Sequence, residues 1–132
     1  MLKTIFVLRR KPGMTLEEFQ TYWHEQHAPL VKRHAGTLGI KCYIQVHSRP
    51  GSQPRRADPL RGEMLKPFDG VAELWIDGQS ATGSEEERRA AAQALAEDES
   101  RFIDFKGSSL WRGDEQFIIE GSPRLDNEGE GH

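Results

Sequence analysis

A single cysteine, Cys42, is the only thiol in the 132 residues, so the chain cannot form an internal disulfide bond. The sequence also has no apolar run approaching the roughly 20 residues that cross a bilayer. The first residues, Met1-Leu2-Lys3-Thr4, lead directly into a strand pattern and contain no secretory signal. These absences favour a cytoplasmic protein with no membrane partner.

Basic residues are not in excess. The 18 Lys and Arg side chains are outnumbered by 21 Asp and Glu, which gives a formal net charge of −3 and a pI near 6.0. Binding to nucleic acid or to an anionic membrane normally requires a basic surplus. We therefore expect neither partner.

Several motifs that indicate a bound cofactor or a catalytic nucleophile are missing as well. The chain has no Gly-rich phosphate loop, no GxSxG elbow and no CxxC pair. The run His24-Glu25-Gln26-His27 is one residue short of the HExxH zinc motif, and no third ligand stands at a supporting spacing. We expect no metal and no other cofactor.

Hydrophobic periodicity predicts four strands and two helices. The strands are expected over 2–10, 40–48, 68–76 and 108–119, and the helices begin after Thr15 and after Ser84. Both helices open with a capping box, in which a Glu stands three residues after the capping Thr or Ser. A further short helix over 98–105 would present Phe102 and Phe105.

Pro29 interrupts the first helix. Because proline has no N–H to donate to the carbonyl four residues earlier, we expect a kink or break near residues 26–28.

The order strand–helix–strand, strand–helix–strand indicates an α+β fold of the ferredoxin-like βαββαβ type, with a four-stranded antiparallel sheet and both helices on one face. The opposite sheet face would be bare, so we expect two copies to pair through it as a homodimer. The expected domain covers residues 1–120, followed by a disordered tail over 121–132. Residues 49–67 form a long Pro- and Arg-rich insertion, interpreted either as a lid or substrate loop or as a mobile surface excursion.

His27 is the first candidate for chemistry. It lies on the apolar face of the first helix, beside the break, where a free carbonyl could hold one ring nitrogen while the other faces a pocket. A neutral imidazole with a pKa near 6.5 can take or give a proton near neutral pH. The alternative is a buried structural histidine with both nitrogens bonded to protein.

Three hydrogen-bonding side chains share one face of the second strand: Tyr43, Gln45 and His47. If this is the helix-facing side, they line a pocket beside His27, and Tyr43 and His47 could polarise a substrate oxygen. If the parity is reversed, they lie in the dimer interface.

The third strand carries two acidic residues on one face, Asp69 and Glu73, together with Val71 and Trp75. Partial desolvation between Val71 and Trp75 would raise the pKa of Glu73 towards that of a useful acid or base. The alternative is a carboxylate that is ion-paired or buried in the subunit interface.

Several stretches resemble the EthD-like family of dimeric α+β barrel proteins. They are Tyr22-Trp23 with 27–31, the strand segment 43–47, the run 68–75, and Asp98-Glu99 with 102–104. The resemblance implies a homodimer of ferredoxin-like subunits, with a pocket between sheet and helices in each. Relatives with this barrel include monooxygenases, isomerases, cyclases and dehydratases, so the resemblance does not select a reaction.

These observations together predict a small cofactor-independent enzyme that transfers protons on a small hydrophobic carbonyl, lactone or phenolic compound. It would act as an isomerase, a cyclase or dehydratase, or a monooxygenase-type oxidoreductase of catabolic or polyketide-type metabolism. His27 would be the general acid or base, and Tyr43 with His47 or Glu73 would orient the substrate oxygen. Substrate-binding residues would be Tyr22, Trp23, Gln45 and Asp69. The alternatives are a non-catalytic dimer that binds a small ligand and an accessory protein to an oxygenase.

Overall fold

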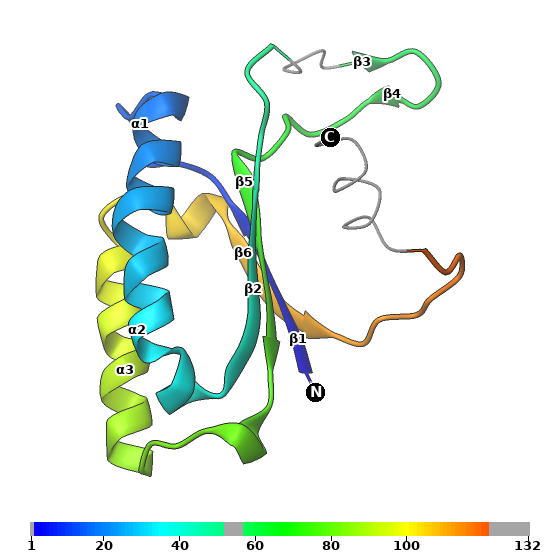
Figure 1. The fold of residues 1–132 in the computed structure, drawn as a ribbon. Helices are drawn as coiled ribbons and strands as arrows, with labels where there is room; N and C mark the ends of the chain where they lie inside the picture. The colour runs from blue at the N-terminus through cyan, green and yellow to red at the C-terminus, as the bar shows by residue number, and fades with distance from the viewer. Residues whose placement is uncertain (1, 52–56, 122–132) are drawn as a thin grey trace, which may run out of the picture.

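The computed structural model describes residues 2–51 and 57–121, with one sheet and a layer of helices on one of its faces (Figure 1). The strands β1 (Leu2–Leu8), β2 (Ile40–His47), β5 (Gly70–Ile76) and β6 (Ser109–Gly113) form this sheet. Their order is β2-β5-β1-β6, and every neighbouring pair is antiparallel. This confirms the ferredoxin-like α+β fold. No helix among the described residues is long and apolar enough to cross a membrane.

The helical layer consists of α1 (Leu16–Tyr22), a π-helical segment Trp23–His27, α2 (Ala28–Leu38) and α3 (Glu85–Glu99). Both predicted capping boxes are present. The π-helical segment lies directly before Pro29, and the Ala28 N–H bonds to the carbonyl of Trp23, five residues back. The predicted break is therefore confirmed as a widened turn, which lets the helix continue past a proline that cannot donate a hydrogen bond.

The core lies between the sheet and the helices. Its buried members are Leu8, Phe19, Trp23, Ala72, Phe102 and Ile103. The Phe19 ring centroid lies 5.5 Å from that of Trp23 and 5.7 Å from that of Phe102, which are ordinary separations for packed aromatic pairs. The aromatic side chains of α1 thus hold the helical layer to the segment that follows α3.

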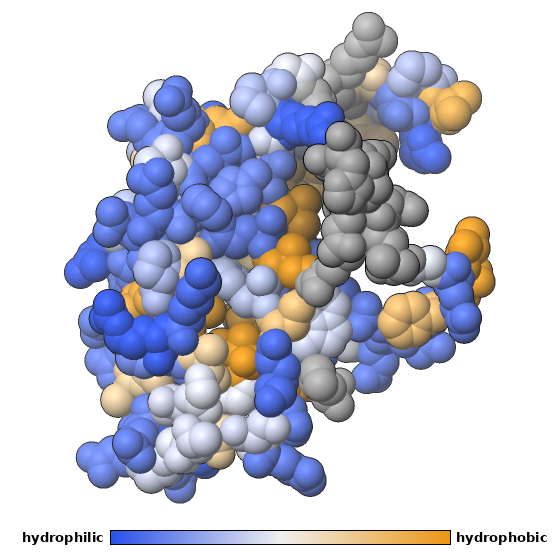
Figure 2. Space-filling view, viewed as in Figure 1, coloured by the Kyte–Doolittle hydropathy of each residue, from blue (hydrophilic) through white to orange (hydrophobic). Residues whose placement is uncertain are grey.

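Among the described residues, no helical layer covers the second face of the sheet. Side chains alternate across the sheet and paired residues share a face. We call this surface the open face, and the strand register assigns to it Lys3, Ile5, Val7, Cys42, Ile44, Val46, Val71, Glu73, Trp75 and Trp111. In the space-filling view the outer helical surface is mostly hydrophilic, whereas hydrophobic residues come to the surface towards the middle and right (Figure 2).

Two sequence expectations in the C-terminal half are wrong. The last strand ends at Gly113 rather than at 119, because Gly113 pairs with Lys3 and β1 begins at Leu2, which leaves no partner strand for later residues. Phe117–Ile119 are accordingly 76–90% exposed. No separate helix forms over 98–105. The helix α3 continues to Glu99, turns containing the buried Phe102 follow, and a single 3-10 turn then spans Phe105–Gly107.

The described part of the 49–67 insertion contains a small hairpin, β3 (Ala57–Asp58) and β4 (Gly62–Glu63), on the side of the sheet away from the helices (Figure 1). Its base is held by Arg9, whose guanidinium donates to the carbonyls of Lys66 and Pro67 at 2.8 and 3.1 Å. Residues 52–56 of the insertion and 122–132 of the predicted tail lie outside the described residues.

A substitution at Gly70 tests the fit between the π-helical segment and the sheet. A Cβ at this position would overlap the indole of Trp23 and lie 3.0 Å from the Val46 carbonyl oxygen. Because neither the buried indole nor the strand backbone can yield cheaply, we expect Gly70→Ala to lower the free energy of unfolding by about 1–3 kcal/mol in urea denaturation. Gly78→Ala, whose Cβ would meet nothing within 4 Å, is the control. Equal effects of the two substitutions would contradict this packing.

Candidate functional site

The polar row of β2 faces the helices. Tyr43 pairs with Leu74, and Gln45 pairs with the buried Ala72, so both point into the core layer. His47 follows with the same parity. The structure thus places the row on the pocket side of the sheet rather than in the open face.

One amide connects this row to the first helix. The Nε2 group of Gln45 donates to the carbonyl of Trp23 at 3.0 Å and to the hydroxyl of Tyr43 at 2.9 Å. A carbonyl can only accept, so the amide nitrogen must point towards Trp23. The Oε1 atom then accepts from Nε2 of His47 at 2.8 Å.

This arrangement determines the tautomer of His47. Because Gln45 Oε1 can only accept, the neutral imidazole of His47 must carry its proton on Nε2. Its Nδ1 atom is therefore the unprotonated, basic nitrogen. The ring is also held in place by stacking on Trp23, with a centroid separation of 4.5 Å and an interplanar angle of 24°.

His24 lies beside His47 and divides the adjoining surface into two hollows. The imidazole centroids are 6.0 Å apart in a T-shaped arrangement. One hollow, of about 390 Å³, is lined by His24, Ala28, Pro29, Lys32, Tyr43, Gln45 and His47. The other, also of about 390 Å³, is lined by Gln20, Thr21, His24, Glu25 and His47. We call the first the β2 hollow.

Burial on the pocket side of β2 shifts the pKa values of two acid–base groups, and both shifts favour the neutral form. Burial lowers the pKa of His47, and the neighbouring imidazole of His24 lowers it further. Burial raises the pKa of Tyr43 by more than the hydrogen bond from Gln45 lowers it. At neutral pH the site therefore contains a neutral imidazole and a protonated phenol, which are a base and a hydrogen-bond donor.

His27, the predicted general base, does not reach this site. Its side chain is buried, and Nδ1 lies 2.8 Å from Oδ2 of Asp98 while Nε2 lies 3.6 Å from Oε2 of Glu99. It lines neither of the two hollows. The expectation that a carbonyl holds one ring nitrogen and a pocket the other is wrong, because both nitrogens face carboxylates of α3.

Electrostatics around His27 favour the protonated ring. Burial alone lowers the pKa of His27, but the hydrogen bonds and charges of Glu99 and Asp98 outweigh it and raise the pKa. Desolvation likewise opposes ionisation of Asp98, yet the bonds from Tyr22 and His27 hold its pKa below the usual range. The imidazole of His27, placed between two carboxylates that favour its protonation, thus ties the π-helical segment to α3.

Tyr22 and Trp23, predicted to bind substrate, lie outside the two hollows around His24 and contact other parts of the protein. The Tyr22 hydroxyl donates to Oδ1 of Asp98 at 2.6 Å and so completes the network around His27. Trp23 is 1% exposed and forms the floor on which His47 stacks. Trp23 itself lines neither of the two hollows.

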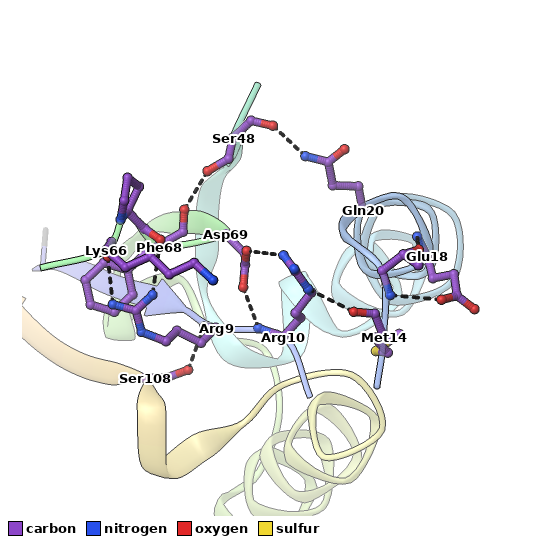
Figure 3. Close-up of polar contacts among 12 residues, drawn as sticks. Arg9, Arg10, Met14, Glu18, Gln20, Ser48, Lys66, Phe68, Asp69 and Ser108 are labelled. Carbon is purple, nitrogen blue, oxygen red and sulfur yellow. Dashed lines mark hydrogen bonds and ion pairs between the residues drawn. The ribbon is translucent and has the colours of Figure 1, made fainter. Parts of the chain in front are cut away.

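The carboxylate of Asp69 forms an ion pair with Arg10. Its carboxylate accepts the Arg10 guanidinium at 2.6 Å and the Arg10 backbone N–H at 2.8 Å, while Arg10 Nε donates to the Met14 carbonyl at 2.9 Å (Figure 3). This network connects the start of β5 to the loop before α1. Asp69 lines neither of the two hollows around His24, and lines instead a separate hollow of about 340 Å³ together with Arg10 and Met14.

Glu73 lies on the open face, across the sheet from Tyr43. It forms an ion pair with Lys3 at 2.7 Å, and the Lys3 ammonium also lies 4.3 Å from the Trp75 ring centroid. The prediction that Glu73 joins Tyr43 and His47 in one site is wrong, because consecutive pairs along β5 put Glu73 and the core residue Leu74 on opposite faces.

His24 was not a predicted site residue. An ideal helix puts it at the edge of the apolar face, whereas the π-helical segment adds a residue to the turn and changes the direction of the side chains there. The break at Pro29 was the signal that pointed to this change. Among the described residues, no group of three His, Cys, Asp or Glu side chains could hold a metal ion.

Residues 11–106, more than half of the chain, match the family model of the EthD domain. The chain belongs to the EthD family. A search of curated proteins found no match. The membership confirms the predicted resemblance, and the matched residues include both the π-helical segment and β2.

Similar solved structures confirm the fold of this EthD protein. An EthD family protein from Bacillus halodurans C-125 is 19% identical with a TM-score of 0.54, over 88% of this chain and 100% of its own. HapK from Hahella chejuensis is 10% identical with a TM-score of 0.53, over 92% and 99%. A dimeric protein with a ferredoxin-like fold from Bacteroides fragilis NCTC 9343 is 8% identical with a TM-score of 0.50, over 88% and 95%.

The buried network of His27 predicts a pH dependence of stability. Its pKa is raised in the folded protein, so the protonated ring stabilises the fold fully below pH 6.5, the pKa of an unperturbed histidine, and this contribution is lost as the pH rises through the raised value. We expect the free energy of unfolding of the wild type to fall from about pH 6.5 upwards. In His27→Gln this part of the slope should be absent in urea denaturation. An unchanged slope would contradict the assignment of the charge to His27.

Proposed function

We propose that this EthD-family protein is a cofactor-independent enzyme that transfers protons on a small, largely hydrophobic carbonyl, lactone or phenolic compound bound in the β2 hollow. The observation that carries the proposal is the hydrogen-bond chain from Tyr43 through Gln45 to His47. It holds a neutral imidazole with a defined basic nitrogen at a hollow that also contains a phenol.

His47 takes the place that the sequence suggested for His27. Its Nδ1 atom removes a proton from a carbon or oxygen acid of the substrate, and its lowered pKa keeps it neutral for this purpose. The Tyr43 hydroxyl oxygen already accepts from Gln45, so its own hydrogen is available to the substrate oxygen on which negative charge develops. Return of the proton to another carbon completes an isomerisation. In a dehydrating cyclisation the carbanion instead attacks a carbonyl carbon of the same substrate and the proton goes to the new alkoxide; removal of a second C–H proton then expels the hydroxyl group, which leaves with a proton as water.

Replacing the base tests the proposal. We expect wild-type protein to accelerate hydrogen–deuterium exchange next to the carbonyl of an aryl ketone probe such as 2-tetralone, followed by NMR in D₂O. Because general-base catalysis contributes about 100-fold or more, His47→Gln should lose most of this acceleration. The wild-type rate should rise with pH below 6.5, as His47 loses its proton, and level off near neutrality.

His34→Gln is the matched control, since it is the same change on α2 at a residue that lines neither hollow. Equal rates for His47→Gln and wild type would refute His47 as the base. Binding of the probe without any exchange would instead support the non-catalytic ligand-binding role.

We also propose that two copies pair through the open face. Support comes from the apolar side chains there, among them Val46 at 47% and Trp111 at 48% exposure, and from the Bacteroides fragilis structure, which is described as dimeric. A contiguous apolar surface of this kind is typical of a protein–protein interface.

A charge on the open face should separate the subunits. Val46→Asp places a carboxylate on an edge strand where the interface would desolvate it, so we expect a monomer at micromolar concentration in sedimentation velocity. Ala92→Asp, on the exposed surface of α3, should leave the dimer intact. A wild-type monomer, or a Val46→Asp dimer of unchanged affinity, would contradict the proposed interface.

A further inference from the structure

The side chains that line the β2 hollow include basic groups but no acidic ones. Its lining contains three side chains that can be positive, His24, Lys32 and His47, and no Asp or Glu. In the whole chain, by contrast, acidic residues outnumber basic ones by 21 to 18. The hollow is thus a local positive region on a protein of negative net charge.

The positive groups are not neutralised by neighbours inside the hollow. Among the described residues no ion pair involves Lys32. The imidazoles of His24 and His47 face each other at 6.0 Å, and the neighbouring His24 lowers the pKa of His47. An anion placed among these groups would interact favourably with the Lys32 ammonium and with any proton gained by an imidazole.

Two carboxylates belong to neighbouring parts of the structure. Glu25 lines the second hollow, which shares His24 and His47 with the β2 hollow. Glu99 acts on Tyr43 through its charge but has its carboxylate 3.6 Å from His27, which is the partner it is paired with. Neither residue lines the β2 hollow itself.

We infer that the substrate is an organic anion, a small aryl or alkyl carboxylate or a compound of equivalent charge, with its negative group held by Lys32 and His24. The apolar body of such a compound would lie against Ala28 and Pro29, and its reacting part beside Tyr43 and His47. This inference rests on the proposed function of the same site and adds the charge of the substrate and two specificity residues.

Lys32 and His24 have different parts in this arrangement. Lys32 presents an ammonium group on an exposed surface of α2, where it can meet an incoming ligand. His24 stands next to the base, so an anion bound there would also raise the pKa of His47 from its lowered value and make the neutral imidazole a stronger base. On the acid side of neutrality, binding of the anion is therefore expected to be coupled to proton uptake.

A pair of probes of the same shape separates charge from hydrophobic contact. We would measure binding of benzoate and of benzamide by isothermal titration calorimetry at low salt and about pH 6.5, the unperturbed histidine pKa. We expect benzoate to bind about tenfold more tightly, because it interacts with more than one cation. The imidazole resonances of His47, followed by NMR, should titrate at higher pH with benzoate than with benzamide.

Lys32→Met keeps the aliphatic stem and the helix propensity while removing the charge. It should weaken benzoate binding about fivefold, as expected for one partly exposed ion pair, and leave benzamide binding unchanged. Arg33→Met is the matched control, because the same charge is removed from the next residue of α2, which does not line the hollow.

Equal affinity for the two probes would overturn the inference. So would a failure of both probes to bind at millimolar concentration, or an equal loss of benzoate affinity in Lys32→Met and Arg33→Met. These outcomes can be told apart from failure of the proposed function. If exchange on the neutral ketone still depends on His47, the catalytic proposal stands and only the preference for an anion falls.

Discussion

The side-chain amide of Gln45 is the contact on which the geometry of the candidate site depends. It bonds simultaneously to the backbone carbonyl of Trp23, to the Tyr43 hydroxyl and to the His47 ring. The Trp23 carbonyl that it contacts belongs to the π-helical segment and also accepts the N–H of Ala28. One amide thus couples the distortion of the helix to the orientation and tautomer of the proposed base.

Two histidines 20 residues apart, His27 in the π-helical segment and His47 on β2, illustrate how surroundings divide one side-chain type into two roles. His27 faces two carboxylates and has a raised pKa, so its charge contributes to stability. His47 is partly buried beside another imidazole and has a lowered pKa, so its neutral form is available for chemistry. Burial acts in the same direction on both rings, and the charge of the neighbours decides the outcome.

Features set by local rules could be predicted from the sequence. The capping boxes, the break before Pro29 and the alternation that puts Tyr43 with His47 depend on residues close together in the chain. The partners of His27 could not be predicted in this way, because Asp98 is 71 residues away and its position depends on how α3 packs. The early end of β6 likewise depends on where β1 begins, which no pattern within 108–119 reveals.

The position of the β2 hollow relative to the open face has a kinetic consequence. β2 is an edge strand whose one face carries Tyr43 and His47 and whose other face carries Ile44 and Val46. Subunits paired through the open face would therefore hold their hollows on the outer sides of the two sheets, with no residue shared between them. Occupation of one site would leave the other unaffected, and saturation with substrate would follow a simple hyperbola without cooperativity.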